Sequence, residues 1–127
     1  LMGVGTPTDL INCVSMGMDM FDCVIPTRNA RNSQLFTKSG KLNIRNAKYK
    51  KDFSPIDQNS LSTLSRAYSK AYLHHLFKIN EILGLRVATS HNLYFYINLM
   101  KEMRDEIING SFYEWSNNFI YNYDKSA

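Results

Sequence analysis

The sequence has few cysteines and no long apolar run, and these absences exclude several classes of protein. Two cysteines in 127 residues cannot form a disulfide framework, and both lie in apolar surroundings typical of buried thiols in a reducing compartment. There is no stretch of 18 apolar residues and no signal-like segment, so we expect a soluble, cytoplasmic protein. Repeats and low-complexity segments are also lacking. A hydrophobic content of 44% is enough for the core of one small domain.

Positive charge is concentrated in the middle of the chain. The formal net charge is +4 and the pI is about 9.1, a balance that many proteins without anionic partners share. The clustering is more informative, because a basic patch is the electrostatic footprint of nucleic-acid binding. A small basic RNA-binding module is therefore one hypothesis for function. The clustered residues are Arg28, Arg31, Lys38, Lys41, Arg45, Lys48, Lys50 and Lys51.

The N-terminal part has the pattern of a strand, a short helix and a second strand. The helix starts with a good N-cap, a proline at the first helical position and a carboxylate three residues after the cap, and it ends at a glycine. One apolar run precedes it, and another follows and stops at a proline. This order predicts the βαβ unit of a parallel sheet. The predicted strands are residues 1–5 and 20–25, and the helix is marked by Thr6, Pro7, Asp9 and Gly17.

The rest of the chain predicts a β-hairpin followed by helices. Residues 35–44 have apolar residues on both sides of a Ser-Gly turn, which is the pattern of a hairpin. Gly84 and Gly110 are natural helix C-caps, and the tail from Tyr121 is expected to fray. The other predicted segments are a turn-rich connection over 45–58, a helix over 61–83, a linking piece over 85–88, a helix over 93–109 with caps offered by Ser90, His91 and Asn92, and a short helix from Ser111 that carries Phe112, Trp115 and Phe119.

Asp22 is the carboxylate that this pattern singles out. Side chains alternate along a strand, so Asp22 shares a face with Met20 and Val24, whereas Asp19 faces the other way. A carboxylate inside an apolar run is costly unless it is paired or used. The carboxyl end of a parallel strand is also where α/β folds place catalytic groups. A structural aspartate that accepts hydrogen bonds from nearby backbone N–H groups is the alternative.

Six segments resemble successive signatures of the bacterial tRNA-guanine transglycosylases (queuine tRNA-ribosyltransferases), in order and at family-like spacing. The resemblance runs from Leu1 to about Gly110 and concerns the C-terminal part of the family. The segments are LMGVGTP (1–7), MFDCVIPTR (20–28), NARN (29–32), NIRNAK (43–48), YSKAYLHHL (68–76) and EILG (81–84).

The resemblance implies an α/β fold class: the C-terminal portion of a (β/α)8 (TIM) barrel, with an inserted β-hairpin and a helical subdomain that holds structural zinc in the family. A complete barrel needs about 250 residues, and this chain begins at Leu1 inside an apolar run, so we expect a fragment, a truncated gene product or a trimmed chain. The expected parts are the last two βα units with the nucleophile strand in 1–34, the basic hairpin and connection in 35–59, and the helical, degenerate zinc subdomain in 60–127.

The resemblance also implies a glycosyltransferase that modifies tRNA on the route to queuosine. The family exchanges guanine at the anticodon wobble position, 34, for a queuosine-precursor deazaguanine through a covalent enzyme–ribose intermediate. The implied partners are thus the tRNA anticodon loop and a deazaguanine base. Asp22 matches the nucleophile, and Met2 and Gly3 match positions that line the base pocket, although a strand-end glycine needed for packing is the alternative at Gly3.

Two stretches match family contacts with tRNA near the wobble base. Guanidinium groups suit such a role because they bind phosphates and base edges bidentately, whereas lone arginines are more often solvated surface charge. The matching residues are Gly3, Val4, Gly5, Thr6, Pro7, Thr8, Asp9, Thr27, Arg28, Asn29, Ala30 and Arg31, with Arg45 and Lys48 as weaker candidates.

The chain departs from the family at the structural zinc site, which there consists of three cysteines and a histidine. All three thiolate positions are serine here, and a serine hydroxyl is a hard, weak donor that stays protonated near pH 7. Zinc is therefore expected of the family but not of this chain, and no organic cofactor is expected. Without metal, residues 60–65 would extend the long helix, and the histidine would be an ordinary residue near a helix start. The four positions are Ser60, Ser62, Ser65 and His91.

A second departure is the region upstream of Leu1, where the family carries its proton-handling carboxylate. The chain alone is therefore expected to be inactive. Two hypotheses stay open beside the RNA-binding module. The chain is either the C-terminal portion of an enzyme that another polypeptide completes, or a degenerate, non-catalytic homologue that binds tRNA or docks onto a full-length homologue as a dimer partner.

Overall fold

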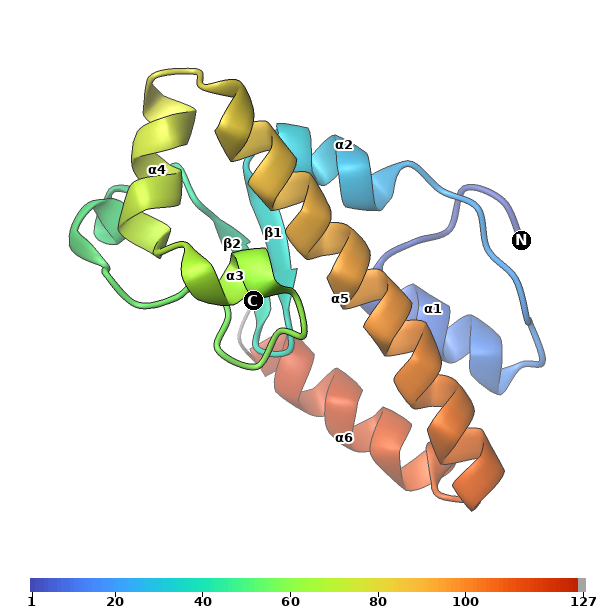
Figure 1. Cartoon of the computed structure of the whole chain (residues 1–127). Helices are drawn as coiled ribbons and strands as arrows, with labels where there is room; N and C mark the ends of the chain where they lie inside the picture. The colour runs from blue at the N-terminus through green and yellow to red at the C-terminus, as the bar shows by residue number, and fades with distance from the viewer. Residues whose placement is uncertain (126–127) are drawn as a thin grey trace.

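The computed structural model describes residues 1–125 as a mixed architecture of helices and one hairpin, built along a single long helix. Helix α5 runs diagonally through the whole molecule, with α2 and the hairpin beside its first half and α1 and α6 beside its second half (Figure 1). The elements are α1 (Pro7–Ser15), α2 (Ile25–Arg31), β1 (Gln34–Thr37), β2 (Gly40–Asn43), the 3-10 helix η1 (Ala47–Lys51), α3 (Thr63–Ala67), α4 (Lys70–Lys78), α5 (Ile82–Asn109) and α6 (Phe112–Lys125).

The start of α1 is the one that the sequence predicts. Thr6 is the N-cap, and its side chain accepts a hydrogen bond from the Asp9 backbone N–H at 3.3 Å. Pro7 occupies the first turn, where its missing N–H costs nothing. Helix α1 ends at Ser15, and Gly17 follows in a left-handed conformation with φ of 95°.

The two strands predicted on either side of α1 are wrong. Residues 1–5 and 20–25 pair only through one isolated parallel bridge, between Met2 and Asp22, and Pro26 lies in the first turn of α2 instead of ending a strand. The reason is that a parallel pair is stable only inside a larger sheet with both faces covered. The predicted burial is wrong too, because Leu1 is 47% exposed and Met2 is 79% exposed.

The predicted hairpin is confirmed. Strands β1 and β2 pair antiparallel from Gln34 opposite Asn43 to Thr37 opposite Gly40, so Lys38 and Ser39 form the two-residue turn. This hairpin is the only sheet within residues 1–125. Its assignment to an insertion in a barrel stays a prediction, as do the three predicted parts of the chain.

The long helix predicted over 61–83 is interrupted. Helix α3 ends at Ala67, its C-cap Tyr68 has an extended backbone with φ of −100° and ψ of 137°, and Ser69 caps a new helix, α4. The interruption has a tertiary cause: the Tyr68 carbonyl accepts a hydrogen bond from Ile56 N–H at 3.1 Å, as an extended residue can do. Residues 60–62 do not extend the helix either, because α3 begins only at Thr63.

Gly84 is not a C-cap, and 85–88 is not a linker. Both lie inside α5, which begins at Ile82 after Asn80 reverses the chain with φ of 57°. Gly84 is there for packing, because a Cβ on it would lie 3.0 Å from the Cβ of Leu76 in α4. The predicted caps at residues 90–92 therefore lie in the helix interior.

The C-terminal part agrees with the sequence except at its end. Gly110 caps α5 with φ of 73°, and α6 carries the predicted aromatic residues. The fraying predicted from Tyr121 is wrong up to Lys125, because α6 continues to that residue and Tyr123 is only 5% exposed. Its ring stacks on Phe119 with centroids 5.7 Å apart, and this packing holds the last turns of the helix.

Two apolar clusters form the core, one at each end of α5. The first joins the hairpin to α4 and the start of α5, and the second joins α1, α6 and the middle of α5. Phe36 contributes to the second cluster, where its ring meets the Tyr96 ring edge-on with centroids 5.2 Å apart. Within residues 1–125, none of the helices is both long and apolar enough to cross a bilayer.

Candidate active site

Asp22, which matches the family's nucleophile, lies next to Met2 and Gly3, which match its base pocket. The Gly3 N–H donates to the Asp22 carbonyl at 2.8 Å, and the Asp22 N–H donates to the Leu1 carbonyl at 3.1 Å. Gly3 has φ of 78° and no atom within 4 Å of where its Cβ would be. The glycine is therefore explained by its left-handed backbone, not by crowding.

The backbone beside this bridge is fixed by close packing and by one buried hydrogen bond. A Cβ on Gly5 would lie 2.0 Å from the Sγ of Cys23, so only glycine lets the two segments approach. The Tyr96 hydroxyl, on α5, donates to the Gly5 carbonyl at 2.6 Å. Burial raises the pKa of Tyr96 far above its ordinary value of 10, so the hydroxyl keeps its proton and remains a donor.

The Asp22 side chain is exposed and borders a shallow cavity of about 240 Å³. Its carboxylate forms no ion pair with any residue in 1–125. The burial argument made from the sequence is thus wrong for this chain, and so is the alternation argument, since 19–21 form no strand and Asp19 is exposed as well. The cavity is lined by Leu10, Phe21, Asp22, Cys23, Pro26, Tyr96, Ile97 and Met100.

Helix α2 begins three residues after Asp22 and carries the predicted tRNA contacts of the second stretch. Arg28 and Arg31 are both exposed. Thr27 and Asn29 are half-buried, with the Asn29 amide donating to the Gln34 side chain at 3.0 Å. Ala30 is fully buried in the core, so its side chain is unable to touch RNA, and only the exposed members of this stretch are placed for contact.

The first predicted stretch is also mostly structural. Gly5 and Pro7 are buried, Thr6 and Asp9 hydrogen-bond each other at the start of α1, and only Asp9 and Gly3 are exposed. Val4 and Thr8 are half-buried. Within this stretch, therefore, contact with a large ligand is open mainly to the backbone around Gly3 and to the first turn of α1.

The two weaker candidates, Arg45 and Lys48, line different cavities. Arg45 lines one of about 430 Å³ together with Lys50, His74 and Lys78. Lys48 lines another, between the hairpin and the loop that follows η1. The two cavities share no residue, so Arg45 and Lys48 do not form one site.

The four positions that match the family's zinc ligands fall into two hydrogen-bonded pairs. The Ser65 Oγ lies 2.7 Å from His91 Nδ1, and the Ser62 N–H donates to the Ser60 Oγ at 3.1 Å. His91 is completely buried in the interior of α5, not near a helix start as predicted. The Ser62 hydroxyl is buried and hydrogen-bonds to no group within residues 1–125.

The hydrogen bonds of His91 define its protonation. Its Nε2 lies 2.7 Å from the Phe36 carbonyl, which only accepts, so Nε2 carries the proton and Nδ1 accepts from the Ser65 hydroxyl. Burial lowers the pKa of His91 below its ordinary value of 6.5, against the opposing effect of the Phe36 carbonyl. The neutral ring is therefore the stable form at neutral pH.

These donors do not fit a zinc ion. Both ring nitrogens of His91 are already engaged by protein groups, and the remaining three positions offer neutral hydroxyls instead of thiolates. Elsewhere in residues 1–125, no three His, Cys, Asp or Glu side chains come together as a metal site would require.

Sequence reasoning missed Asn92 and Tyr96, the two side chains that fix the site to α5. The Asn92 amide donates to the carbonyls of Pro26 at 2.9 Å and Gln34 at 3.0 Å, and its oxygen accepts from the Phe36 N–H at 3.1 Å. The sequence signal for these two residues is their i, i+4 spacing, which places two polar side chains on the same, otherwise apolar, face of a helix. Because the helix was predicted to begin at residue 93, this spacing was not recognised.

Comparison with known proteins matches the chain over nearly its whole length to one family. The family model described as "Queuine tRNA-ribosyltransferase" covers residues 1–125. The chain is 50% identical over 127 residues to a queuine tRNA-ribosyltransferase of Helicobacter pylori (strain ATCC 700392 / 26695), covering 100% of this chain and 34% of that protein. It is 54% identical over 123 residues to one of Francisella tularensis subsp. novicida (strain U112), covering 97% of this chain and 34% of that protein.

These relatives are, by their names, transferases that act on tRNA. The chain belongs to the queuine tRNA-ribosyltransferase family, which confirms the resemblance seen in the sequence. It spans about a third of the length of the curated relatives that it matches.

Proposed function

We propose that the chain forms the nucleophile-bearing part of a tRNA-guanine transglycosylase, which exchanges guanine at the wobble position for a deazaguanine base. The observation that carries the proposal is the junction of Asp22 with Met2 and Gly3 through two backbone hydrogen bonds. At this junction the Asp22 carboxylate is exposed beside Gly3, which has free space where a side chain would lie. Helix α2, with the exposed Arg28 and Arg31, begins three residues after Asp22. Membership of the family supports the same assignment.

In the proposed reaction the Asp22 carboxylate is the nucleophile. One of its oxygens attacks C1′ of the ribose at position 34, and the glycosidic bond breaks with its electron pair leaving on guanine. The nucleotide must be splayed out of the anticodon stack for this attack. A nitrogen of the incoming base then attacks the same carbon and releases the carboxylate. Two displacements retain the sugar configuration, as in retaining glycosidases.

The residues around Asp22 have positioning roles in this proposal. The backbone at Met2 and Gly3 would lie against the base, and Arg28 and Arg31 would hold phosphates of the anticodon loop. Protons at the leaving and entering bases need a second group. In the family this group belongs to the region that precedes the matched segments, and we assign the role to no residue of this chain.

The test is incorporation of radiolabelled guanine into unmodified tRNA. We expect no exchange by the chain alone and exchange when the N-terminal two-thirds of a relative is added. Asp22→Asn should abolish the restored activity, while Asp19→Asn, a matched change on an exposed carboxylate three residues away, should leave most of it. Full activity of Asp22→Asn would overturn the assignment of the nucleophile.

A second candidate function is a non-catalytic homologue that binds tRNA or docks onto a full-length homologue. It is favoured by the serines that stand at the three positions matching the family's zinc-binding cysteines, since they are a departure from the family's pattern. Retained tRNA binding, with no exchange under either condition of the assay above, would establish this alternative in place of the enzyme.

We also infer that the chain does without the zinc of its family. The hydrogen bond between Ser65 and His91 takes over the connection between residues 60–65 and α5 that a metal would otherwise make, and His91 also bonds to the Phe36 carbonyl in β1. The donor chemistry supports this inference, because no thiolate is present at the matching positions.

A further inference from the structure

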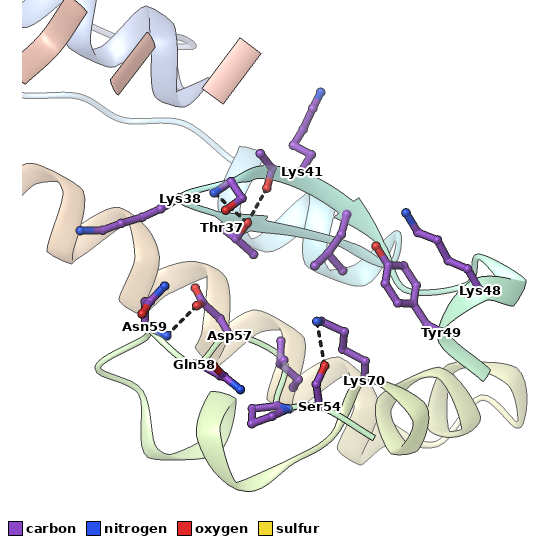
Figure 2. Close-up of a pocket in the computed structure, with 15 residues that line it drawn as sticks. Thr37, Lys38, Lys41, Lys48, Tyr49, Ser54, Asp57, Gln58, Asn59 and Lys70 are labelled. Atoms are coloured by element: carbon purple, nitrogen blue, oxygen red, sulfur yellow. Dashed lines mark hydrogen bonds between the residues drawn. The ribbon is translucent and has the colours of Figure 1, made fainter. Parts of the chain in front are cut away.

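A cavity of about 530 Å³ lies between the β-hairpin and the loop of residues 54–59. Figure 2 shows the hairpin as its upper wall and the loop as its lower wall, with Tyr49 and Lys70 closing one end. It shares no residue with the cavity beside Asp22, so it is a separate site. Its lining residues are Thr37, Lys38, Ser39, Gly40, Lys41, Leu42, Lys48, Tyr49, Ser54, Pro55, Ile56, Asp57, Gln58, Asn59 and Lys70.

The walls of this cavity are fixed by hydrogen bonds within each wall. At the hairpin tip the Thr37 hydroxyl donates to the Gly40 carbonyl at 2.9 Å. In the loop the Asn59 N–H donates to the Asp57 carboxylate at 2.9 Å, and Ile56 is tied to α3 through the Tyr68 carbonyl. A ligand would therefore meet a preformed cavity, which lowers the entropic cost of binding.

Four lysines line the cavity, and two of them are neutralised by the protein itself. Lys38 pairs with Glu102 on α5 at 2.5 Å. Lys70 lies 3.6 Å from Asp52 and donates to the Ser54 hydroxyl at 3.0 Å. Hydrogen bonds from Ser54 hold the pKa of Asp52 below its ordinary value, so Asp52 stays ionised.

The other two lysines, Lys41 and Lys48, form no ion pair with any side chain that the structure describes. Figure 2 shows the Lys41 side chain on the outer side of the hairpin, pointing away from the loop. Lys48 is held over the Tyr49 ring, with its Nζ 5.0 Å from the centroid. Its ammonium group is therefore the uncompensated positive charge at the cavity, and it suits a phosphate.

The opposite wall has different chemistry. Gln58 and Asn59 present side-chain amides, which both donate and accept, and Asp57 presents a carboxylate that only accepts. Such a mixture suits the edge of a nucleobase, whose donors and acceptors alternate. An acidic peptide fits less well, because its carboxylates would face Asp57. The volume lies within the range of about 300–1,000 Å³ that sites for small ligands occupy.

We propose that this cavity binds one nucleotide of an RNA chain, with its phosphate at Lys48 and its base edge against Gln58 and Asn59. The proposal rests on the proposed function for the identity of the RNA, a tRNA, and adds a contact site for a nucleotide other than the one that Asp22 attacks. The hairpin and the loop 54–59 thus form a second RNA-binding site.

The test is the binding of fluorescein-labelled tRNA to the chain by fluorescence anisotropy, at several salt concentrations. For Lys48→Gln we expect several-fold weaker binding at low salt and a salt dependence reduced by about one phosphate contact. The matched control is Lys41→Gln, which removes the same charge from an exposed side chain that points away from the cavity and should bind like wild type.

Gln58→Ala/Asn59→Ala tests the other wall. We expect several-fold weaker binding with an unchanged salt dependence, because an amide carries no charge. All the substituted residues are exposed, and a thermal melt of each variant confirms that it folds. The test measures binding and not exchange, so failure of the catalytic proposal leaves it intact.

Several outcomes would overturn the proposal. These are the absence of tRNA binding by the wild type, or equal affinities for Lys48→Gln and its control Lys41→Gln. A third is unchanged tRNA binding by Lys48→Gln together with loss, in the same variant, of directly measured binding of adenosine monophosphate or inorganic phosphate, which would make the cavity a site for free nucleotides. Competition by polyglutamate that is independent of Gln58 and Asn59 would make it a peptide site.

Discussion

The serine positions around His91 give the sharpest prediction about this chain, namely that three substitutions restore zinc binding. Two ligands of a tetrahedral zinc, a sulfur at about 2.3 Å and a nitrogen at about 2.0 Å, lie roughly 3.5 Å apart. The Ser65 Oγ and His91 Nδ1 are 2.7 Å apart, which is a hydrogen-bond distance. Zinc therefore has no place between them in this chain, whereas a longer Cβ–Sγ bond at position 65 and a shift of under an ångström would admit it.

We expect Ser60→Cys/Ser62→Cys/Ser65→Cys to bind zinc with Nδ1 of His91 as the fourth ligand. At free zinc a thousand times the dissociation constant, the stabilisation is about 4 kcal/mol, which for a chain of this size raises the melting temperature by roughly 15 °C. Melting curves with zinc and with a chelator measure it. The wild type should show no difference between the two conditions.

Two controls make the experiment decisive. His91→Ala in the triple-cysteine background should lose most of the gain, and Ser15→Cys/Ser39→Cys/Ser90→Cys, which adds three scattered thiols, should show none. A zinc-dependent rise in the melting temperature of the wild type would refute the donor argument. A triple-cysteine variant that zinc leaves unchanged would refute the placement of the four positions in one site.

Four further predictions concern stability and are measured by urea unfolding. Asn92→Ala should cost about 3 kcal/mol or more, because three buried hydrogen bonds lose their partner; a loss under 1 kcal/mol would contradict this role. Gly5→Ala should destabilise by about 1–3 kcal/mol through the clash with Cys23, and Cys23→Ala in the same chain should recover part of it. Ser62→Ala should stabilise by about 1 kcal/mol, since its buried hydroxyl is unpaired within residues 1–125. Burial lowers the pKa of His91 in the folded chain, so its contribution to stability is complete above about pH 6.5 and is lost as the pH falls through the folded-state pKa; in His91→Gln this part of the pH profile should be flat.

Local rules predicted those elements whose signals lie within a few residues. The capped start of α1 depends on Thr6 and Pro7 alone, and the end of α5 depends on the left-handed conformation of Gly110. The hairpin depends on apolar residues around a short turn. Each of these signals is complete in the local sequence, so no distant partner could override it.

The failures have tertiary causes. The helical pattern is interrupted at Tyr68 because its carbonyl accepts a hydrogen bond from the Ile56 N–H. Gly84 is required for close packing against α4 and does not cap a helix. The two strands predicted around Asp22 are reduced to one isolated bridge. A parallel strand needs further paired strands beside it, and residues 1–125 do not provide them. For the site, collinear motifs singled out Asp22, Met2 and Gly3, and the structure places these residues side by side, although their roles stay predictions. The burial and alternation arguments for Asp22 did not hold.

Both backbone polar groups of Phe36 are hydrogen-bonded to consecutive residues of α5. The His91 ring donates to its carbonyl, and the Asn92 side-chain oxygen accepts from its N–H. This double attachment sets which part of the hairpin tolerates a change in length. An insertion between Gln34 and Phe36 would move the attachment off its partners and expose a buried histidine and a buried asparagine. An insertion at Lys38 or Ser39 lies beyond the attachment and would disturb only the surface ion pair between Lys38 and Glu102. The tip of the hairpin can therefore vary in length without disturbing the core.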